Sequence, residues 1–347
     1  MSPSAVDTDA IGLSIDRDEV SDLRAVLTSE SAPLARRFRA LFALKHYAAL
    51  QPPKKESLPA IRAIAAAFTS PSALLKHELA YCLGQSRNLE SVPYLRRVLE
   101  DKDEDDMCRH EAAEALGALG DFKSLGLLRQ LKDDPEELQV VRETCDIAVD
   151  RIEWEHSKHR GVERLKPRWA TAKFRINHIA DARTSDFASI DPAPPLAQLA
   201  KQPSIVDLQI NLLNTKLPLF QRYRAMFALR DLCSPPELPT AVPAVQALAS
   251  GFNDPSALFR HEIAFVFGQL SHPASIPSLV ETLSNEKEES MVRHEAAEAL
   301  GSLGDEEGVE DVLKRFVDDP NQVVRDSIIV ALDMAEFERT GEKEYAI

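Results

Sequence analysis

Apolar residues recur along this chain at intervals of three and four positions, the spacing of one face of an α-helix. The stretches "LESVPYLRRVLED" (89–101) and "MCRHEAAEALGAL" (107–119) show this pattern twice in succession, separated by a short polar turn. The stretches "HPASIPSLVETLS" (272–284) and "MVRHEAAEALGSL" (291–303) show it again. The pattern predicts pairs of amphipathic helices, each pair forming a hairpin.

Long stretches of the chain occur twice, with an offset of 184 residues. The segments 107–121 and 291–305 differ at only two of fifteen positions. The segments 72–85 and 256–269, "SALLKHELAYCLGQ" and "SALFRHEIAFVFGQ", agree at eight of fourteen. The chain is therefore predicted to consist of two copies of one ancestral half.

A shorter repeat lies inside each half, because 33 residues separate His77 from His110 and also His261 from His294. Paired helices with a period of 33 to about 40 residues indicate an α-solenoid of the HEAT type. We expect an all-α fold of about eight HEAT-like helical hairpins in two pseudo-symmetric halves. The predicted divisions are an N-terminal tail (1–17), an N-terminal half (18–156), a linker (157–205) and a C-terminal half (206–340). A linker of this length would let the second half turn to face the first.

Composition supports helices packed on helices, since aromatic residues make up only 6% of the chain and charged residues 28%. The formal net charge of −15 argues against nucleic-acid or anionic-membrane binding and favours a cationic partner. The four cysteines show no CxxC spacing, so they are predicted to be reduced core residues of an intracellular protein. The N-terminal residues lack a secretory signal, and no apolar stretch is long enough to span a membrane.

Four of the nine histidines are followed directly by glutamate, at the same place in the second helix of their repeat. Second helices of a solenoid line its concave face about 8–10 Å apart, so these side chains would meet between neighbouring helices. Packing requires neither a histidine nor an adjacent carboxylate, whereas metal binding uses both. The pairs are therefore predicted to bind metal: His77–Glu78, His110–Glu111, His261–Glu262 and His294–Glu295.

The donor types narrow the choice of metal. Imidazole and carboxylate without cysteine disfavour a closed structural zinc site and match non-haem iron that handles oxygen. Two sets of ligands imply two ions, which would form a dinuclear centre if the halves face each other. Zinc or manganese hydrolase chemistry stays open from ligand type alone.

Two further carboxylates, Glu114 and Glu298, follow His110 and His294 by four residues and share their helix faces. The surplus negative charge would favour a substrate amine, although both carboxylates could instead form ordinary surface ion pairs. A glycine follows each motif histidine by seven residues, at 84, 117, 268 and 301. Close helix packing explains these glycines most simply, and contact with a substrate chain is the alternative.

The four motifs resemble those of the deoxyhypusine hydroxylase family: "KHELAYCLGQ" (76–85), "RHEAAEALG" (109–117 and 293–301) and "RHEIAFVFGQ" (260–269). The resemblance covers both halves. It implies a cytoplasmic, and also nuclear, monooxygenase of hypusine biosynthesis. This enzyme would use a peroxo di-iron centre in the cleft between the halves to hydroxylate deoxyhypusine in eukaryotic translation initiation factor 5A.

The resemblance also implies roles for particular residues. Two Fe(II) ions would be held by His77, Glu78, His110, Glu111, His261, Glu262, His294 and Glu295, with O2 as cosubstrate and an external reductant. Glu78 and Glu262 are assigned a catalytic role as well, and whether they bind iron directly is left open. Gly84, Glu114, Gly268 and Glu298 would contact the aminobutyl chain of the substrate. The expected enzyme is a monomer that binds neither nucleic acid nor membrane; the alternative is an interaction scaffold with a structural metal or none.

Overall fold

The computed structural model describes residues 17–157, 189–196 and 204–340. Within these ranges the regular structure is helical and no strand is found, so the prediction of an all-α solenoid is confirmed. The number of repeats and the domain boundaries remain predictions. The predicted tail and most of the linker lie outside the described residues.

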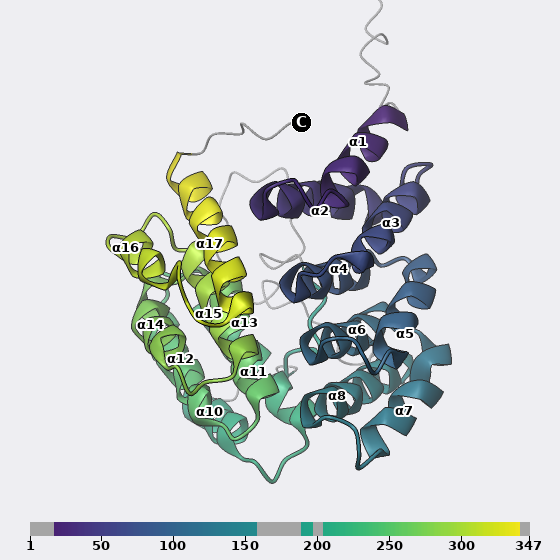
Figure 1. Ribbon diagram of the computed structural model, residues 1–347. Helices are drawn as coiled ribbons and strands as arrows, with labels where there is room; N and C mark the ends of the chain where they lie inside the picture. The colour runs from purple at the N-terminus through teal and green to yellow at the C-terminus, as the bar shows by residue number, and fades with distance from the viewer. Residues whose placement is uncertain (1–16, 158–188, 197–203, 341–347) are drawn as a thin grey trace, which may run out of the picture.

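The helices alternate between an outer and an inner layer of the solenoid. The outer helices are α1 (Arg17–Leu27), α3 (Ser57–Ala66), α5 (Val92–Glu100), α7 (Leu125–Asp133), α10 (Ile205–Leu213), α12 (Ala241–Ala249), α14 (Ile276–Ser284) and α16 (Val309–Leu313). The inner helices are α2 (Leu34–Ala48), α4 (Ala73–Gln85), α6 (Asp106–Leu119), α8 (Gln139–His156), α11 (Leu219–Cys233), α13 (Ala257–Leu270), α15 (Ser290–Gly301) and α17 (Gln322–Thr340). Figure 1 shows α1–α8 and α10–α17 as two stacks that face each other.

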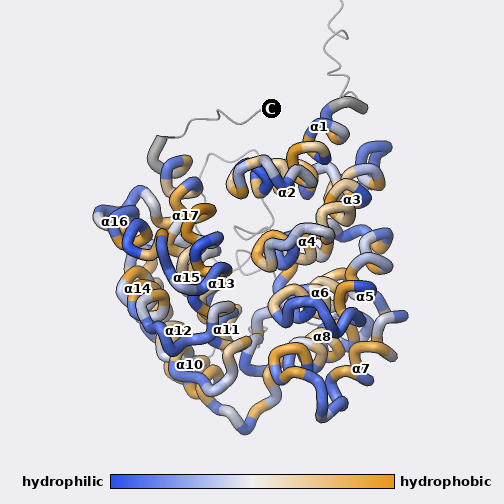
Figure 2. Tube along the Cα trace, viewed as in Figure 1, coloured by the Kyte–Doolittle hydropathy of each residue, from blue (hydrophilic) through white to orange (hydrophobic). Residues whose placement is uncertain are grey.

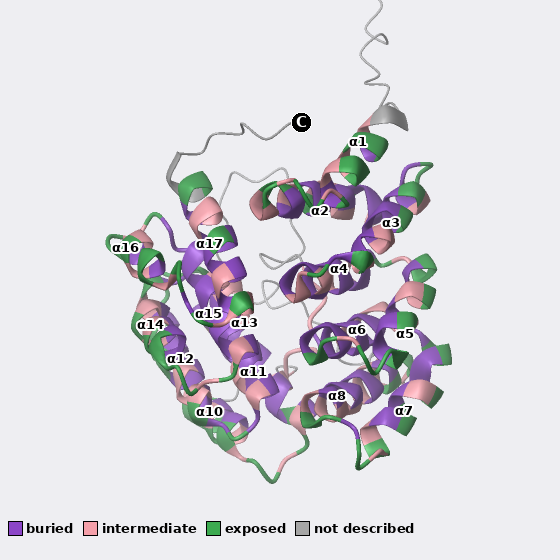
Figure 3. Ribbon diagram, in the orientation of Figure 1, coloured by how far each residue is buried: buried purple, intermediate pink, exposed green. Residues whose placement is uncertain are grey.

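Each helix pair buries its apolar stripe against its neighbours, as the sequence pattern predicts. Hydrophobic and hydrophilic positions alternate around the helices (Figure 2), and the inner helices α4, α6 and α8 are largely buried (Figure 3). The four cysteines are buried and form no disulfide, which agrees with their prediction as core residues.

Glycines bring successive inner helices into close contact. A Cβ atom on Gly84 of α4 would lie 2.7 Å from Cα of Ala115 on α6. The corresponding distance is 3.0 Å from Gly117 to Ala148 and 2.8 Å from Gly301 to Ala331. Because Cβ contacts this short are absent or rare in proteins, the packing role predicted for these three glycines is confirmed. At the fourth, Gly268, an added Cβ would lie 3.5 Å from Cα of Ala299, an ordinary contact.

The two stacks contact each other at both ends. Helix α8, the last of the first stack, packs against α11 and α13, and α17, the last of the second stack, packs against α2 and α4. These junctions are pseudo-symmetric, because each joins the end of one half to the start of the other. The inner helices of both halves therefore enclose a common central space.

Candidate metal centre

Local capping fixes where the helices that carry the motifs begin. The side chain of Ser72 accepts a hydrogen bond from the backbone N–H of Leu75 at the start of α4, and Ser256 does the same for Phe259 in α13. Asp105 accepts from the N–H of Met107 at the start of α6. These caps fix the starts of three of the four motif helices, and α15 begins at Ser290 without a side-chain cap; in all four the histidine is the fifth residue of its helix.

The basic residue before each motif histidine anchors its helix on the opposite side. Arg109 donates to both carboxylate oxygens of Glu137, at 2.8 and 2.7 Å, and to the carbonyl of Leu99. These hydrogen bonds hold the pKa of Glu137 below its ordinary value. Equivalent ion pairs join Lys76 to Glu104, Arg260 to Glu288, and Arg293 to Asp319. Sequence reasoning missed this anchor, although the basic residue precedes all four motifs.

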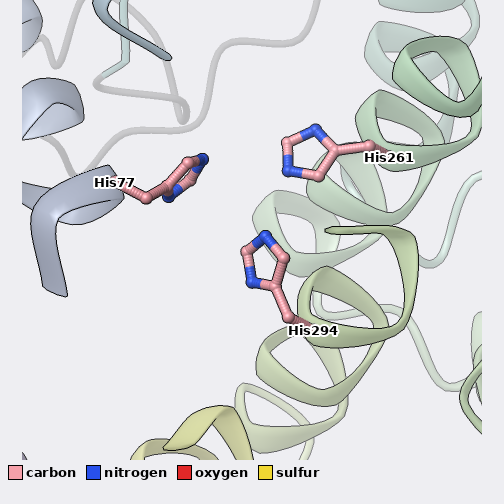
Figure 4. Close-up of side chains that lie close together, drawn as sticks. All are labelled: His77, His261 and His294. Atoms are coloured by element: carbon pink, nitrogen blue, oxygen red, sulfur yellow. The ribbon is translucent and has the colours of Figure 1, made fainter. Parts of the chain in front are cut away.

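The four motif histidines converge from both halves. The ring centroids are 5.3 Å apart for His77 and His110, and 5.4 Å apart for His261 and His294. Across the cleft, His77 lies 5.2 Å from His294, and His110 lies 5.3 Å from His261. Figure 4 shows His77 on one side of the cleft, with its ring directed toward those of His261 and His294.

Glutamates of one helix reach the histidine of the neighbouring helix. Oε2 of Glu111 lies 3.3 Å from Nε2 of His77, and Oε2 of Glu295 lies 3.4 Å from Nε2 of His261. Three groups of donor atoms each fall within 4.8 Å: His77, His261 and His294; His77, His110 and Glu111; and His294, Glu295 and Glu298. The predicted metal ligands therefore meet in one place, from both halves.

Glu78 and Glu262 occupy a different position from Glu111 and Glu295. Neither belongs to the three groups of close donor atoms, and Oε2 of Glu78 lies 3.9 Å from Nδ1 of the adjacent His77. Both nevertheless line the central cavity. Whether they bind metal directly, and whether they act catalytically, stays a prediction.

The cavity beside these residues has a volume of about 190 Å³ and is strongly acidic. Glu114 and Glu298 line it, as expected if they meet a substrate, whereas Gly84 and Gly268 are not among its lining residues. Substrate contact by the glycines stays a prediction. The full lining is Phe42, Lys45, His77, Glu78, Tyr81, Glu111, Glu114, His261, Glu262, Phe265, Glu295 and Glu298.

The motif histidines are buried without hydrogen bonds. Among the described residues, neither ring nitrogen of His77, His110, His261 or His294 has a hydrogen-bond partner. Buried polar atoms are normally paired, so eight unpaired imidazole nitrogens in one place call for a ligand. Burial lowers the pKa of His77, His110 and His294, which keeps these rings neutral and able to coordinate a cation.

Burial has the opposite effect on the carboxylates. It raises the pKa of Glu78 to about 7 and that of Glu111 to about 8. The pKa values of Glu114, Glu262 and Glu298 also rise well above the ordinary value, first through burial and then through neighbouring carboxylates. Closely spaced carboxylates repel one another unless positive charge offsets them. Divalent metal ions fit this donor set, and an interaction scaffold gives no reason for it.

A described part of the linker, residues 189–196, joins the two halves through hydrogen bonds to α4, α11 and α13. The side chain of Gln85 at the end of α4 accepts from the N–H of Ile190 and donates to its carbonyl, at 2.6 and 3.3 Å. Gln269 at the end of α13 donates to the hydroxyl of Ser189 at 2.6 Å. Sequence reasoning missed this strap, although Gln85 and Gln269 occupy matched places in the duplicated segments.

An arginine also holds the strap. Arg230 of α11 donates to both carboxylate oxygens of Asp191, at 2.7 and 2.8 Å. A second cavity, of about 750 Å³, lies outside the central one and includes Gln85, Ser189 and Gln269 in its lining. The strap therefore contributes Ser189 to the wall of the outer cavity.

Comparison with known proteins agrees with this geometry. A family model of HEAT repeats matches residues 61–148 and 243–333. A Phaeosphaeria nodorum protein named deoxyhypusine hydroxylase is 70% identical over 329 residues, covering 95% of each chain. A Neosartorya fischeri protein of the same name is 66% identical, covering 100% of this chain and 97% of the relative. Across the described residues, every helix is too short or too polar to cross a lipid bilayer.

A solved structure supports the same relationship. The structure of human deoxyhypusine hydroxylase in complex with glycerol is 42% identical in sequence to this chain, with a TM-score of 0.74. The similarity covers 92% of this chain and 96% of the human one. Relatives of one name thus match nearly the whole length, including both halves that supply the histidines. This chain belongs to the deoxyhypusine hydroxylase family.

Proposed function

We propose that this enzyme hydroxylates the deoxyhypusine side chain of a protein, eukaryotic translation initiation factor 5A, with two iron ions and O2. The observation that carries the proposal is the convergence of four His-Glu pairs whose eight ring nitrogens are buried and unpaired. Family membership supplies the reaction, and the donor set supplies a place for the metal. The proposed substrate combines a protein surface with a cationic side chain.

The four motif histidines, with Glu111 and Glu295, would form two sets of metal ligands, one from each half. One ion would be held by His77, His110 and Glu111, whose donor atoms lie within 4.8 Å of one another. The other would be held by His294 and Glu295, with His261 reaching Glu295 across the helix pair. Bound iron would supply the activation of O2, with electrons from an external reductant. One oxygen atom would enter the substrate and the other would leave as water.

The chain's own residues bind and orient the substrate. The acidic cavity lined by Glu114 and Glu298 would hold the terminal ammonium group through charge-assisted hydrogen bonds. Burial of the histidines and glutamates excludes bulk water from the centre, which strengthens these interactions. The hydroxylated carbon would thus be fixed by the group at the end of its own chain.

The setting of the reaction is part of the proposal. We place the enzyme in the cytoplasm and also in the nucleus, because four buried free thiols suit a reducing compartment. The enzyme is proposed to act as a monomer, since both sets of ligands come from one chain. The net charge of −15 suits a basic loop of the protein substrate better than nucleic acid.

Metal content is the first test. Wild-type protein purified anaerobically and aerobically should contain close to two irons per chain. His110→Ala and His294→Ala should each lose both ions, because each replacement opens the shared centre. His156→Ala is the matched control, since His156 is exposed at the end of α8. Zinc alone, or no metal in folded protein expressed with ample iron, would contradict the proposal.

Oxygen incorporation is the second test. The metal-loaded enzyme, a reductant and deoxyhypusine-containing initiation factor 5A are incubated under labelled O2, and the product is analysed by mass spectrometry. One labelled oxygen atom should appear on the modified lysine. Label taken from water instead of O2 would exclude a monooxygenase, and the absence of any product would exclude the proposed substrate.

A further inference from the structure

The pseudo-symmetry of the two halves is broken next to the proposed metal centre. In the matched segments "RFRALFALKH" (37–46) and "RYRAMFALRD" (222–231), Lys45 of α2 corresponds to Arg230 of α11. Arg230 is buried and paired with Asp191 of the strap. Lys45 forms no ion pair and no hydrogen bond with any described residue. The same position thus carries an ion-paired cation in one half, whereas in the other half the cation acts on the Glu78 carboxylate only through longer-range charge.

Aromatic rings contact the cation in both halves. The Arg230 guanidinium lies 4.8 Å from the ring centroid of Phe227, which corresponds to Phe42, and it also has Asp191 as its ion-pair partner. The Lys45 ammonium lies 4.5 Å from the centroid of the Tyr81 ring and 5.5 Å from that of Phe42. Tyr81 and Phe265 are matched residues of the two halves, and their rings meet edge to face with centroids 6.0 Å apart. The negative faces of aromatic rings attract cations at these distances. Phe42, Tyr81 and Phe265 therefore form an aromatic throat, in which the Lys45 ammonium lies against the first two rings.

The aromatic throat lies between the two cavities. Phe42, Lys45, Tyr81 and Phe265 line both the central cavity of about 190 Å³ and the outer one of about 750 Å³. These four residues are therefore the wall that the central and outer cavities share. The strap lines the same outer cavity through Ser189, and the Arg230–Asp191 pair holds the strap in place.

We propose that the aromatic throat of Phe42, Tyr81 and Phe265 is a binding site for the internal, secondary ammonium of the substrate side chain, and that Lys45 occupies this site until substrate displaces it. The proposal rests on the proposed function, and it adds a second point of recognition to the acidic cavity. The deoxyhypusine side chain carries two amines joined by a butyl chain. The acidic cavity would bind the terminal amine while the throat binds the internal one.

The chemistry of the throat suits a group that must enter and leave. A carboxylate at this position would hold the internal amine tightly, as Asp191 holds Arg230, and would slow release of the product. Aromatic faces bind an ammonium more weakly than such an ion pair does. Lys45 has a long flexible stem, so its ammonium can move into the outer cavity when the substrate arrives.

Two small amines of equal length test the site by calorimetric titration of the metal-loaded enzyme. N-butyl-1,4-diaminobutane carries an internal and a terminal amine, whereas nonylamine replaces the internal NH by a methylene. Tyr81→Leu should weaken binding of the diamine by about tenfold and leave nonylamine within about twofold. Tyr81→Phe keeps the ring face and should bind both probes as the wild type does.

Lys45 and Phe42 provide independent variants. Lys45→Met should bind the diamine about threefold to tenfold more tightly, because no resident ammonium then competes. Phe42→Leu alters a half-exposed ring and should weaken diamine binding about threefold. The matched controls are Phe122→Leu and Lys287→Met, exposed residues remote from the cleft, which should leave binding of both probes unchanged.

The outcomes separate this proposal from the proposed function. If Tyr81→Leu and Phe42→Leu weaken both amines equally, the rings are ordinary apolar lining and the ammonium site is wrong. If Lys45→Met leaves diamine binding unchanged or weaker, the displacement of Lys45 is wrong. Either result can coincide with normal hydroxylation by the wild type, whereas failure of the function itself appears as absent iron or absent labelled product.

Discussion

At the scale of single residues, the buried carboxylates make the metal-free protein sensitive to pH. Burial raises the pKa of Glu78 to about 7 and that of Glu111 to about 8, from an ordinary value near 4.5. Between about pH 4.5 and pH 8, these carboxyl groups keep their protons in the folded protein but lose them in the unfolded chain. The free energy of unfolding therefore falls as pH rises through this range.

The histidines act in the opposite direction at lower pH. Because burial lowers the pKa of His77, His110 and His294, the unfolded chain binds more protons than the folded one below about pH 6.5. Above pH 6.5 most histidines of the unfolded chain are neutral, so the carboxylates dominate this balance. We expect the melting temperature of metal-free protein to fall between about pH 6.5 and 8, measured by calorimetry after chelation.

Two comparisons check the cause of that fall. Glu111→Gln removes one titrating group and should flatten the dependence. Metal loading should also flatten it, because bound cations offset the ionised carboxylates and require deprotonated ligands. A metal-free melting temperature that rises steadily from pH 6.5 to 8 would contradict the assignment of raised pKa values to these glutamates.

The candidate site was predictable from sequence only where its residues repeat. The four His-Glu pairs stand at matched positions, so a shared site followed from duplication and helix geometry. Lys45 and Tyr81 were not predicted, because their partners in the other half, Arg230 and Phe265, are different residue types. A site that depends on broken symmetry leaves no repeated signal in a single sequence.

At the scale of helices, Gly84 sets the distance between α4 and α6. An added Cβ would lie 2.7 Å from both Cα and Cβ of Ala115, and the backbone of α6 cannot yield as a flexible side chain would. Gly84→Ala should lower the free energy of unfolding by about 1–3 kcal/mol, measured by urea denaturation. Separation of the two helices should also lower metal content, because they carry His77 and His110.

The matched residue Gly268 supplies the control. Its added Cβ would lie 3.5 Å from Cα of Ala299, an ordinary contact, so Gly268→Ala should keep the stability of the wild type. If Gly268→Ala loses activity without losing stability, the predicted contact of this glycine with substrate is supported. Equal destabilisation by both variants would show that the close approach at Gly84 is not what limits the packing.

The ion pair behind α6 provides a second test at this scale. Arg109 and Glu137 are both buried, so Arg109→Leu leaves a carboxylate without its partner. The free energy of unfolding should fall by about 3–5 kcal/mol. Arg129→Leu breaks an exposed pair with Glu153 and should cost less than about 1 kcal/mol. If both variants lower the free energy of unfolding by similar amounts, Arg109 does not anchor α6.

Most helices were predictable because their hydrophobic period is regular and their repeats confirm one another. The strap at 189–196 was not, because "SIDPAPPL" has no period and acquires its structure from partners distant in sequence. Gln85 binds it from 105 residues away, and Arg230 holds it from 39 residues away. Local pattern carries no information on contacts of this kind.

At the scale of the whole molecule, hydrogen bonds between the halves hold the two stacks face to face. The hydroxyl of Ser72, which caps α4, donates to Asp326 of α17 at 3.1 Å. The hydroxyl of Ser256, which caps α13, donates to Glu143 of α8 at 2.6 Å. These two inter-half clamps are pseudo-symmetric, and each tethers a helix that carries a motif histidine to the opposite half.

The clamps matter because the candidate metal centre is assembled across the cleft. His77 and His294 lie 5.2 Å apart on different halves, so a small opening of the ring would separate them. The double variant Asp326→Ala/Glu143→Ala removes both acceptors and keeps the serine caps intact. It should release metal to a chelator faster than the wild type, and it should have a larger radius of gyration in X-ray scattering when metal-free. Asp146→Ala/Glu153→Ala removes two carboxylates outside the inter-half junctions and is the matched control; if it releases metal equally fast, surface charge and not the clamps governs retention.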